Sequence, residues 1–298
     1  MEICPASQSH QSVSSKPQSA KLQSAIRLSV FVCAHNEAAN LGACLERLSF
    51  ADEVVVLLDR STDGSAAIAC ALGDRVIEGV FPLEGPRRAA AQAACSGKWV
   101  LEVDADEHIP PALSREIRAR LDRGEPADWY LVPVDNYVGG RLIRCGWGGS
   151  FWTSAVARLY RRGAKSWGNE RVHPTIHMAG RYGGRLSSSI DHWVDTDISD
   201  MLCRLDRYSA QRAADIQRLS KGRYGLLSHL FRGIRRFWKC YVTRRGYREG
   251  DWEVLIALMA ALYPVLSELR ARLEVPGDLS KTEPQPNATP RWTKWRRD

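Results

Sequence analysis

Three carboxylates, Asp104, Asp106 and Glu107, stand almost side by side in the segment LEVDADEH, directly after a short apolar run. Like charges this close repel one another unless a positive charge lies among them. A divalent cation is the simplest source of that charge, because carboxylates are hard oxygen ligands and water and phosphates complete the coordination shell. The alternative is a helix start, where the helix dipole favours acidic residues ahead of Pro110 and Pro111. The segment alone leaves both interpretations open.

Continuous apolar segments predict the elements that position these carboxylates. Four of them are typical of strands buried on both faces, and they lie at 28–34, 53–59, 75–80 and 98–104. Helix-compatible stretches separate them, and 129–138 and 155–162 predict two further strands of the same sheet. This rhythm predicts an α/β fold, a Rossmann-like three-layer sandwich, in which ligands gather at the carboxyl ends of the strands.

Other polar residues stand at the ends of the same strands. Asn36 and Glu37 follow the first strand, and Asp59 ends the second in the segment DRSTDG. Arg87 and Arg88 begin a helix beside the same edge, where they can hold a diphosphate by charge-assisted hydrogen bonds. Each has a plainer alternative. Asn36 can cap a helix, Asp59 can start an Asx-turn, and the arginines can form a solvated pair.

In their order along the chain, the segments HNEAANL, DRSTDGS and RRAAAQAACSGKWVLEVDADE resemble the donor-binding half of a family 2 glycosyltransferase with the GT-A fold. The likeness covers 27–108. It implies a UDP-sugar donor and a divalent cation, Mg²⁺ or Mn²⁺. It also implies that Asn36 and Glu37 belong to the donor site.

The same resemblance assigns roles to four further residues. It implies that Asp59 recognises the uracil of the donor and that Arg88 contacts the diphosphate. It implies that Asp104 lies near the ribose and the metal, and that Asp106 holds the metal. The resemblance thus implies that Asp104 and Asp106 are the metal-binding pair, which would explain why carboxylates are crowded in this segment.

Later segments resemble lipopolysaccharide-core glucosyltransferases, a subgroup of that family. RLYRRG, VH, DHW and RYSAQRAADIQR carry this weaker likeness to about residue 270. Two departures stand out. Arg60 replaces the small residues that usually follow the uracil-binding aspartate, and Pro174 stands where the subgroup has a glutamate after its histidine.

The reaction implied is displacement of a nucleoside diphosphate by an acceptor hydroxyl with inversion at the sugar carbon, and it needs a general base. Glu170 in GNERVHP is the first candidate because it precedes His173 near the family's acidic position. Asp191 in IDHW is the second. A solvated surface position for Glu170 and a structural pair of Asp191 with His192 are the alternatives.

Three tryptophans, Trp147, Trp152 and Trp167, fall in the region expected to face the acceptor. Aromatic faces commonly stack on sugar rings, and ordinary packing of large rings is the equal alternative. The acceptor expected from the resemblance is a cell-surface glycan, either a lipopolysaccharide core or a lipid-linked glycan.

The basic residues gather in the second half of the chain. The chain has a formal net charge of +8, and 13 basic and 3 acidic residues fall between 201 and 250, so the remainder is slightly acidic. Within 226–242, aromatic and aliphatic residues repeat at helical spacing between arginines. Such a helix can lie on an anionic membrane or dock partly on the α/β core. No nucleic-acid-binding motif is present, so nucleic acid is the least favoured partner.

These patterns predict a lead-in at 1–26, a GT-A domain at 27–197, a helical membrane-proximal extension at 198–275 and a loose tail at 276–298. The apolar stretch 252–266 is shorter than the roughly 20 residues that span a bilayer, so no membrane-spanning helix is predicted. Cysteines without metal-ligand spacing indicate reduced thiols. The predicted location is cytoplasmic, peripheral on the inner face of the cytoplasmic membrane.

Two other functions compete with sugar transfer. A nucleotidyltransferase on a similar sheet also needs carboxylates and a metal near phosphates, but it would show a glycine-rich loop where this chain has HNEAAN. A catalytically silent, membrane-bound scaffold would retain the fold alone. Asp59, Asp104 and Asp106 argue against the scaffold, because crowded carboxylates without a metal would only destabilise it.

Overall fold

The computed structural model describes residues 13–15, 27–124, 126–146, 155–168, 174–219 and 226–274. The chain divides into two compact units, Met1–Arg144 with Gly148–Thr196 and Cys145–Trp147 with Asp197–Asp298. Most of the predicted lead-in and all of the predicted tail lie outside the described residues. Within the lead-in, β1 (Val13–Ser15) pairs antiparallel with β4, whose outer edge would otherwise leave backbone groups unpaired.

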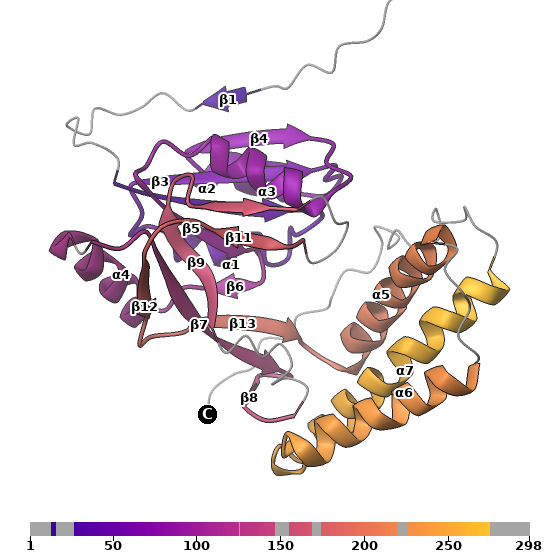
Figure 1. The fold of residues 1–298 in the computed structure, drawn as a ribbon. Coiled ribbons are helices and arrows are strands. Elements are labelled where there is room, and N and C mark those ends of the chain that lie inside the picture. The colour runs from indigo at the N-terminus through magenta and orange to yellow at the C-terminus, as the bar shows by residue number, and fades with distance from the viewer. Residues whose placement is uncertain are drawn as a thin grey trace, which may run out of the picture. The chain divides into compact units, whose positions relative to one another are not determined.

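The first unit is built around a mixed sheet (Figure 1). Its described strands run in the order β1-β4-β3-β2-β5-β9-β7-β13-β6, and β8 and β12 also pair with β7. Their bounds are β2 Leu28–Ala34, β3 Glu53–Asp59, β4 Arg75–Gly79, β5 Trp99–Asp104, β6 Glu107–His108, β7 Trp129–Val138, β8 Arg141–Ile143, β9 Ala155–Arg161, β12 Tyr182–Arg185 and β13 Ile190–Asp195.

The central strands β4, β3, β2 and β5 are parallel, whereas β9 runs antiparallel to both β5 and β7. Every residue of β3 is buried, in keeping with its continuous apolar sequence EVVVLLD. The predicted α/β fold is therefore confirmed. The strands predicted at 28–34, 53–59 and 129–138 have the predicted ends.

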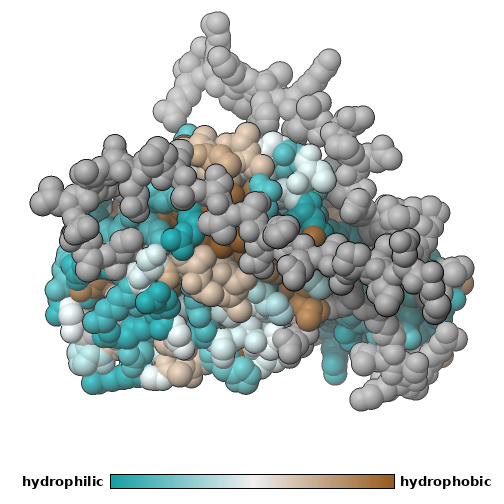
Figure 2. Space-filling model, turned by 90° about the horizontal axis from the view of Figure 1, so that it is seen from above, coloured by the Kyte–Doolittle hydropathy of each residue, from teal (hydrophilic) through white to brown (hydrophobic). Residues whose placement is uncertain are grey.

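Helices and a hairpin cover the two faces of the sheet. One face packs against α1 (Leu41–Glu46), α2 (Ser65–Leu72) and α4 (Pro111–Arg123). The other packs against α3 (Glu84–Ala93) and the hairpin of β10 (Lys165–Trp167) and β11 (Ile176–Met178). The described surface is mixed, with hydrophilic residues around smaller apolar areas (Figure 2), as is normal for a folded protein.

The second unit is helical. It contains α5 (Ile198–Leu219), α6 (Leu226–Trp238), a π-helical turn at Lys239–Thr243, a 3₁₀ turn at Gly246–Arg248 and α7 (Asp251–Leu273). The helix α7 packs against both α5 and α6. Among the described residues, α7 is the helix whose length and composition would let it cross a membrane. The stretch 252–266 is part of this longer helix of 23 residues, and length and composition alone do not show that it spans a membrane.

Asp52 ties the start of β2 to α4 at the edge of the first unit. Its Oδ2 accepts hydrogen bonds from the backbone N–H of Arg27 (3.0 Å) and Leu28 (2.9 Å). Its Oδ1 pairs with the Arg118 guanidinium of α4 at 2.6 Å. Burial alone would raise the pKa of Asp52, but the hydrogen bonds from Arg118 and the two backbone groups lower it below its ordinary value.

The lowered pKa of Asp52 predicts a pH dependence of stability. The folded state holds the charged carboxylate more strongly than the unfolded chain does, so this stabilisation is present above the ordinary pKa of about 4 and is lost as pH falls below it. We expect Asp52→Asn to unfold at a lower urea concentration than wild type at pH 7 and to lose less stability between pH 5 and pH 3. Urea titrations at these pH values measure this, with Asp122→Asn as the exposed control. Equal pH slopes in all three proteins would contradict it.

Candidate active site

The strand register brings the polar strand ends to one edge of the sheet. Cys33 of β2 lies beside Asp104 of β5, and Ala34 lies beside Leu58 of β3. Since these strands are parallel, the segment after β2, the end of β3 and the end of β5 meet at the same edge. His35 confirms this proximity, because its Nδ1 lies 2.5 Å from the backbone oxygen of Asp59.

The loops after β2 and β3 are joined to each other. Asn36 has a positive φ of 55°, and its Oδ1 accepts a hydrogen bond from the Thr62 N–H at 2.8 Å. The Glu37 N–H donates to Ser65 Oγ at 3.0 Å, and the Ala38 N–H donates to Asp63 Oδ2 at 2.9 Å. Asn36 thus links two loops and does not cap α1, whose N-cap is a later residue. These hydrogen bonds hold Asn36 and Glu37 at the edge of the sheet where β2 and β3 end.

Asp59 is buried beneath an arginine. Its Oδ1 accepts hydrogen bonds from the Phe81 N–H at 2.9 Å and from Arg60 Nε at 3.0 Å, and its Oδ2 accepts one from the second arm of Arg60 at 3.2 Å. Arg60 has a φ of 51°, a left-handed backbone conformation that is uncommon for a residue other than glycine. Arg87 of α3 lies 3.8 Å from Asp59 Oδ2, and its buried Nε has no hydrogen-bond partner among the described residues. Arg60, which departs from the family pattern, therefore covers Asp59, the carboxylate expected to bind uracil.

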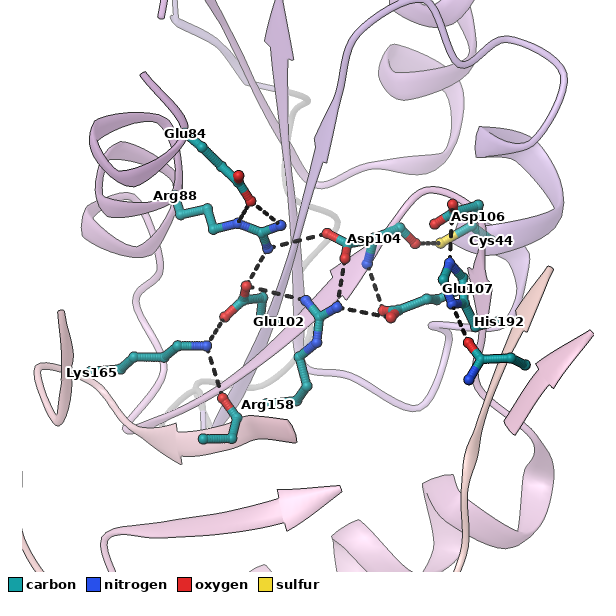
Figure 3. A network of polar contacts seen from close by, with 12 residues as sticks. Cys44, Glu84, Arg88, Glu102, Asp104, Asp106, Glu107, Arg158, Lys165 and His192 are labelled. Atoms are coloured by element: carbon teal, nitrogen blue, oxygen red, sulfur yellow. Dashed lines mark hydrogen bonds and ion pairs between the residues drawn. The ribbon is translucent and has the colours of Figure 1, made fainter. Parts of the chain in front are cut away.

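Glu102 is the centre of a buried ion cluster (Figure 3). It lies in the middle of β5, and its side chain is 3% exposed. Arg88 of α3, Arg158 of β9 and Lys165 of β10 all donate to it, with Arg158 at 3.1 Å. Three cations from three elements therefore meet on one carboxylate.

The same arginines neutralise the crowded carboxylates after β5. Arg158 lies 2.5 Å from Asp104 Oδ2 and 2.8 Å from Glu107 Oε1, and Arg88 lies 3.1 Å from Asp104 Oδ1. Burial alone would raise the pKa of Asp104, but Arg158 and Arg88 hold it well below its ordinary value. Burial raises the pKa of Glu107 to about 7, against the opposing effect of Arg158. The protein's own cations supply the charge that the sequence led us to expect from a metal.

Asp106 points away from this cluster. Figure 3 shows it on the side of His192, whereas Asp104 lies on the side of Arg88 and Arg158. The Asp106 side chain is 38% exposed, and its Oδ2 lies 3.3 Å from His192 Nε2. Burial alone would lower the pKa of His192, but Asp106 and the neighbouring carboxylates raise it. The other ring nitrogen, His192 Nδ1, lies 2.8 Å from Asn136 Oδ1.

The donors present can take a metal ion only in part. Among the described residues, no group of three or more His, Cys, Asp and Glu side chains is arranged to hold one. Both oxygens of Asp104 are paired with guanidinium groups, whereas Asp106 is an accessible hard ligand. One carboxylate fits a Mg²⁺ or Mn²⁺ ion whose remaining ligands are phosphates and water.

The structure describes only one of the two candidate bases. Glu170 lies outside the described residues, as do His173, Trp147 and Trp152. Asp191 lies on β13, where burial and the neighbouring Asp135 raise its pKa.

Asp191 leaves the sheet on the face opposite to that of its neighbour His192. Successive side chains of a strand alternate between the two faces. His192 contacts Asp106, whereas the charged groups that influence Asp191 are Asp135 and Arg47 of the segment ending α1. Trp167 packs edge-on against Phe31 and Tyr160, which favours the packing interpretation over a sugar platform for this ring.

Sequence reasoning missed Glu102, Arg158, Lys165 and the contact of His192 with Asp106. A signal for the first two was present, because each is a charged residue inside an otherwise apolar strand, WVLEVD and AVARLYR. A buried charge needs a partner of opposite sign. Which charges pair could not be known before β5 and β9 were found to be neighbours.

The model of the family described as glycosyl transferase family 2 matches residues 29–181, about half of the chain. The chain belongs to this family. It is a glycosyltransferase, which sets aside the nucleotidyltransferase and the silent scaffold. The resemblance expected from the strand-end motifs is confirmed, and so is the likeness to proteins of lipopolysaccharide-core synthesis.

Two curated relatives show how far the likeness extends. The lipopolysaccharide core biosynthesis glycosyltransferase LpsC of Rhizobium meliloti (strain 1021) is 29% identical over 253 residues, which cover 80% of this chain and 90% of that protein. An uncharacterized glycosyltransferase, RC0292 of Rickettsia conorii (strain Malish 7), is 33% identical over 242 residues, covering 74% of this chain and 81% of that one.

One solved structure of similar sequence is glucosyl-3-phosphoglycerate synthase from Mycobacterium tuberculosis in complex with Mg²⁺ and uridine-diphosphate. It is 29% identical, covers 39% of this chain and 45% of that chain, and gives a TM-score of 0.32. A likeness at this TM-score says nothing of how the present glycosyltransferase binds a ligand.

The ion cluster predicts a large cost for removing Arg158. We expect Arg158→Met to lower the free energy of unfolding by about 3–5 kcal/mol, because it leaves buried carboxylates without their counter-charge. Adding Glu107→Gln should restore part of this loss, since one uncompensated carboxylate is removed. Urea titration measures both effects.

The matched control for Arg158→Met is Arg162→Met, which removes an exposed guanidinium that donates to the Cys95 carbonyl at 2.9 Å. This control should change the free energy of unfolding by less than about 1 kcal/mol. Equal losses in the two single variants would refute the role of Arg158 in the cluster.

Proposed function

We propose that this glycosyltransferase is an inverting, metal-dependent enzyme that moves a sugar from a UDP-sugar to a hydroxyl of a cell-surface glycan acceptor, a lipopolysaccharide core or a lipid-linked glycan. One observation carries the proposal. Asp106 is an accessible carboxylate beside a cluster whose other carboxylates are already paired with arginine or lysine, at the sheet edge that also carries Asp59. The name of the relative LpsC supports the acceptor class. The proposed location is the inner face of the cytoplasmic membrane, where a lipid-linked acceptor would be accessible.

The donor's uridine is assigned to the pocket edge formed by Asp59, Arg60 and the joined loops that carry Asn36 and Glu37. Because Arg60 occupies the carboxylate of Asp59, a uracil either displaces this guanidinium or is recognised jointly with it. The diphosphate is assigned to Arg87 as well as to the expected Arg88. Arg88 is paired with Glu84, Glu102 and Asp104, whereas Arg87 Nε has no hydrogen-bond partner in the part of the chain that the structure describes.

Asp106 is assigned as the protein ligand of the cation, with the donor's phosphate oxygens as further ligands. A bound Mg²⁺ or Mn²⁺ supplies positive charge that stabilises the departing diphosphate. His192 holds the Asp106 carboxylate in position through its Nε2. Asp104 is assigned to the ribose of the donor. A carboxylate paired with two arginines still has lone pairs that can accept a hydrogen bond from a ribose hydroxyl.

The general base is assigned to Glu170, which accepts the proton of the attacking acceptor hydroxyl. Asp191 has the raised pKa of a candidate base, and the charged groups that act on it are Asp135 and Arg47. Its position on the face opposite to His192 argues against a role beside the metal. The sequence candidate Glu170 is therefore kept in first place.

Removing Asp106 should separate metal-assisted from metal-independent binding. We expect calorimetry to show UDP binding to wild type that is more than about tenfold tighter with Mn²⁺ than without it. Asp106→Ala should bind UDP equally weakly in both conditions, since the metal ligand is gone. Asp122→Ala, which removes an exposed aspartate of α4, should behave like wild type. A metal effect that survives in Asp106→Ala would overturn the assignment.

The two candidate bases are separated by kinetics. We expect Glu170→Gln to lower kcat by about 10²- to 10⁴-fold while UDP binding is unchanged, because a base acts only in the chemical step. Asp191→Asn should retain kcat within about threefold. The initial rate of sugar transfer from the donor measures both. A large loss in Asp191→Asn with full activity in Glu170→Gln would move the base role to Asp191.

A further inference from the structure

The helix α6 has two unlike faces, and contacts with α7 define the inner one. His229 and Gly233 of α6 are buried, and so is Cys240 in the π-helical turn that follows. Gly233 packs so closely that a Cβ there would lie 2.7 Å from the backbone oxygen of Ala261. His229 Nε2 lies 3.4 Å from Glu268 Oε2 of α7. These contacts fix which side of α6 faces its neighbour within the second unit.

The outer face of α6 is apolar. Leu227, Phe231, Ile234 and Trp238 follow one another at spacings of four, three and four residues, so they form one stripe. Their exposed fractions are 70%, 70%, 65% and 62%. Single exposed apolar residues are ordinary, but a continuous stripe of large ones marks a binding surface. We call these four residues the α6 stripe.

Positive charge borders the α6 stripe. Arg232, Arg235 and Lys239 are exposed and follow one edge of the stripe at helical spacing. Between 226 and 248 the chain has seven Lys and Arg and no Asp or Glu. The surface is thus apolar along a line and strongly cationic beside it.

We propose that the α6 stripe inserts into the boundary between headgroups and acyl chains of an anionic lipid bilayer, with the bordering arginines and lysine at the lipid phosphates. An amphipathic helix with large apolar residues on one face and basic residues beside them has the chemistry for this position. A second copy of the same face would bring two sets of seven positive charges together, which disfavours self-association.

The inference rests on the part of the proposed function that places the enzyme at a membrane, and it specifies the surface that makes the contact. It assigns α7 the role of support for α6. Glu253, Ser267 and Glu268 of α7 are buried within the described structure. A helix lying in the headgroup layer is released by high salt, because screening weakens its attraction to anionic lipid, whereas a spanning helix is not released.

The test uses the purified full chain and vesicles, without donor or acceptor, so that its result is independent of the transfer reaction. Sedimentation should show binding to vesicles of phosphatidylcholine with phosphatidylglycerol at low salt. It should show at least about tenfold weaker binding to phosphatidylcholine alone. Raising the salt to 1 M should release the protein.

Two pairs of variants test the α6 stripe itself. Phe231→Ser with Trp238→Ser should weaken binding by at least about tenfold, since two large apolar side chains are lost, whereas Val80→Ser, an exposed apolar residue of the first unit, should not. Arg232→Glu with Arg235→Glu should also weaken vesicle binding by at least about tenfold. Arg115→Glu with Arg123→Glu on α4 changes the net charge by the same amount. This control should change the logarithm of the affinity by less than half as much. Circular dichroism checks that each variant is folded.

A third variant locates the contact. Trp238→Phe should keep vesicle binding and lose part of the fluorescence quenching by brominated lipid, which places this ring in the bilayer. Absence of wild-type binding, or equal binding by all variants, would overturn the inference. So would protein that stays on vesicles at 1 M salt, as a spanning α7 requires. If the α6 stripe variants instead change only the oligomeric state in solution, the surface is an interface between copies and the proposal fails.

Discussion

The guanidinium of Arg158 is the interaction on which the candidate active site depends. It joins Glu102 in the middle of β5 to Asp104 and Glu107 beyond the end of that strand, and it comes from β9, the antiparallel neighbour of β5. An arginine can do this because its planar fork presents several donors at once. Without such a counter-charge, buried carboxylates at this spacing would repel one another strongly in the low-dielectric interior. Arg88 of α3 and Lys165 of β10 also pair with Glu102 and add two further positive charges to the cluster.

This balance separates two aspartates that look alike in the sequence. Asp104 is held by two arginines, with its pKa well below the ordinary value, and so acts as a rigid anion of the sheet edge. Asp106 faces away, partly exposed, with His192 as its partner. A site that combines a fixed, neutralised base with one accessible carboxylate can bind a cation together with a substrate phosphate without building a complete protein cage. At the same edge, a hydrogen bond from the Thr62 N–H to Asn36 Oδ1 joins the loops after β2 and β3.

The second unit is held together by a different principle. On the side of α6 that packs on α7, Gly233 allows a close approach, His229 meets Glu268 and Phe237 is partly buried, while the four residues of the α6 stripe face outward. A helix that served only to fill a core would have the opposite arrangement. The sequence pattern of 226–242 permitted either membrane contact or docking of the apolar residues on the core. Only the packing against α7 distinguishes which residues are covered.

The sequence by itself determined the α/β fold, the ends of three of the strands and the edge at which the polar strand-end residues gather, because buried parallel strands and the turns after them are encoded locally. It also indicated the family, since HNEAANL, DRSTDGS and DADE occur in a characteristic order. The tertiary structure decided which charges compensate one another. Arg158 lies more than fifty residues after Glu102 in the chain, and only the pairing of β9 with β5 brings them together. Partners that distant are set by strand order, and no local pattern in this single sequence specifies it.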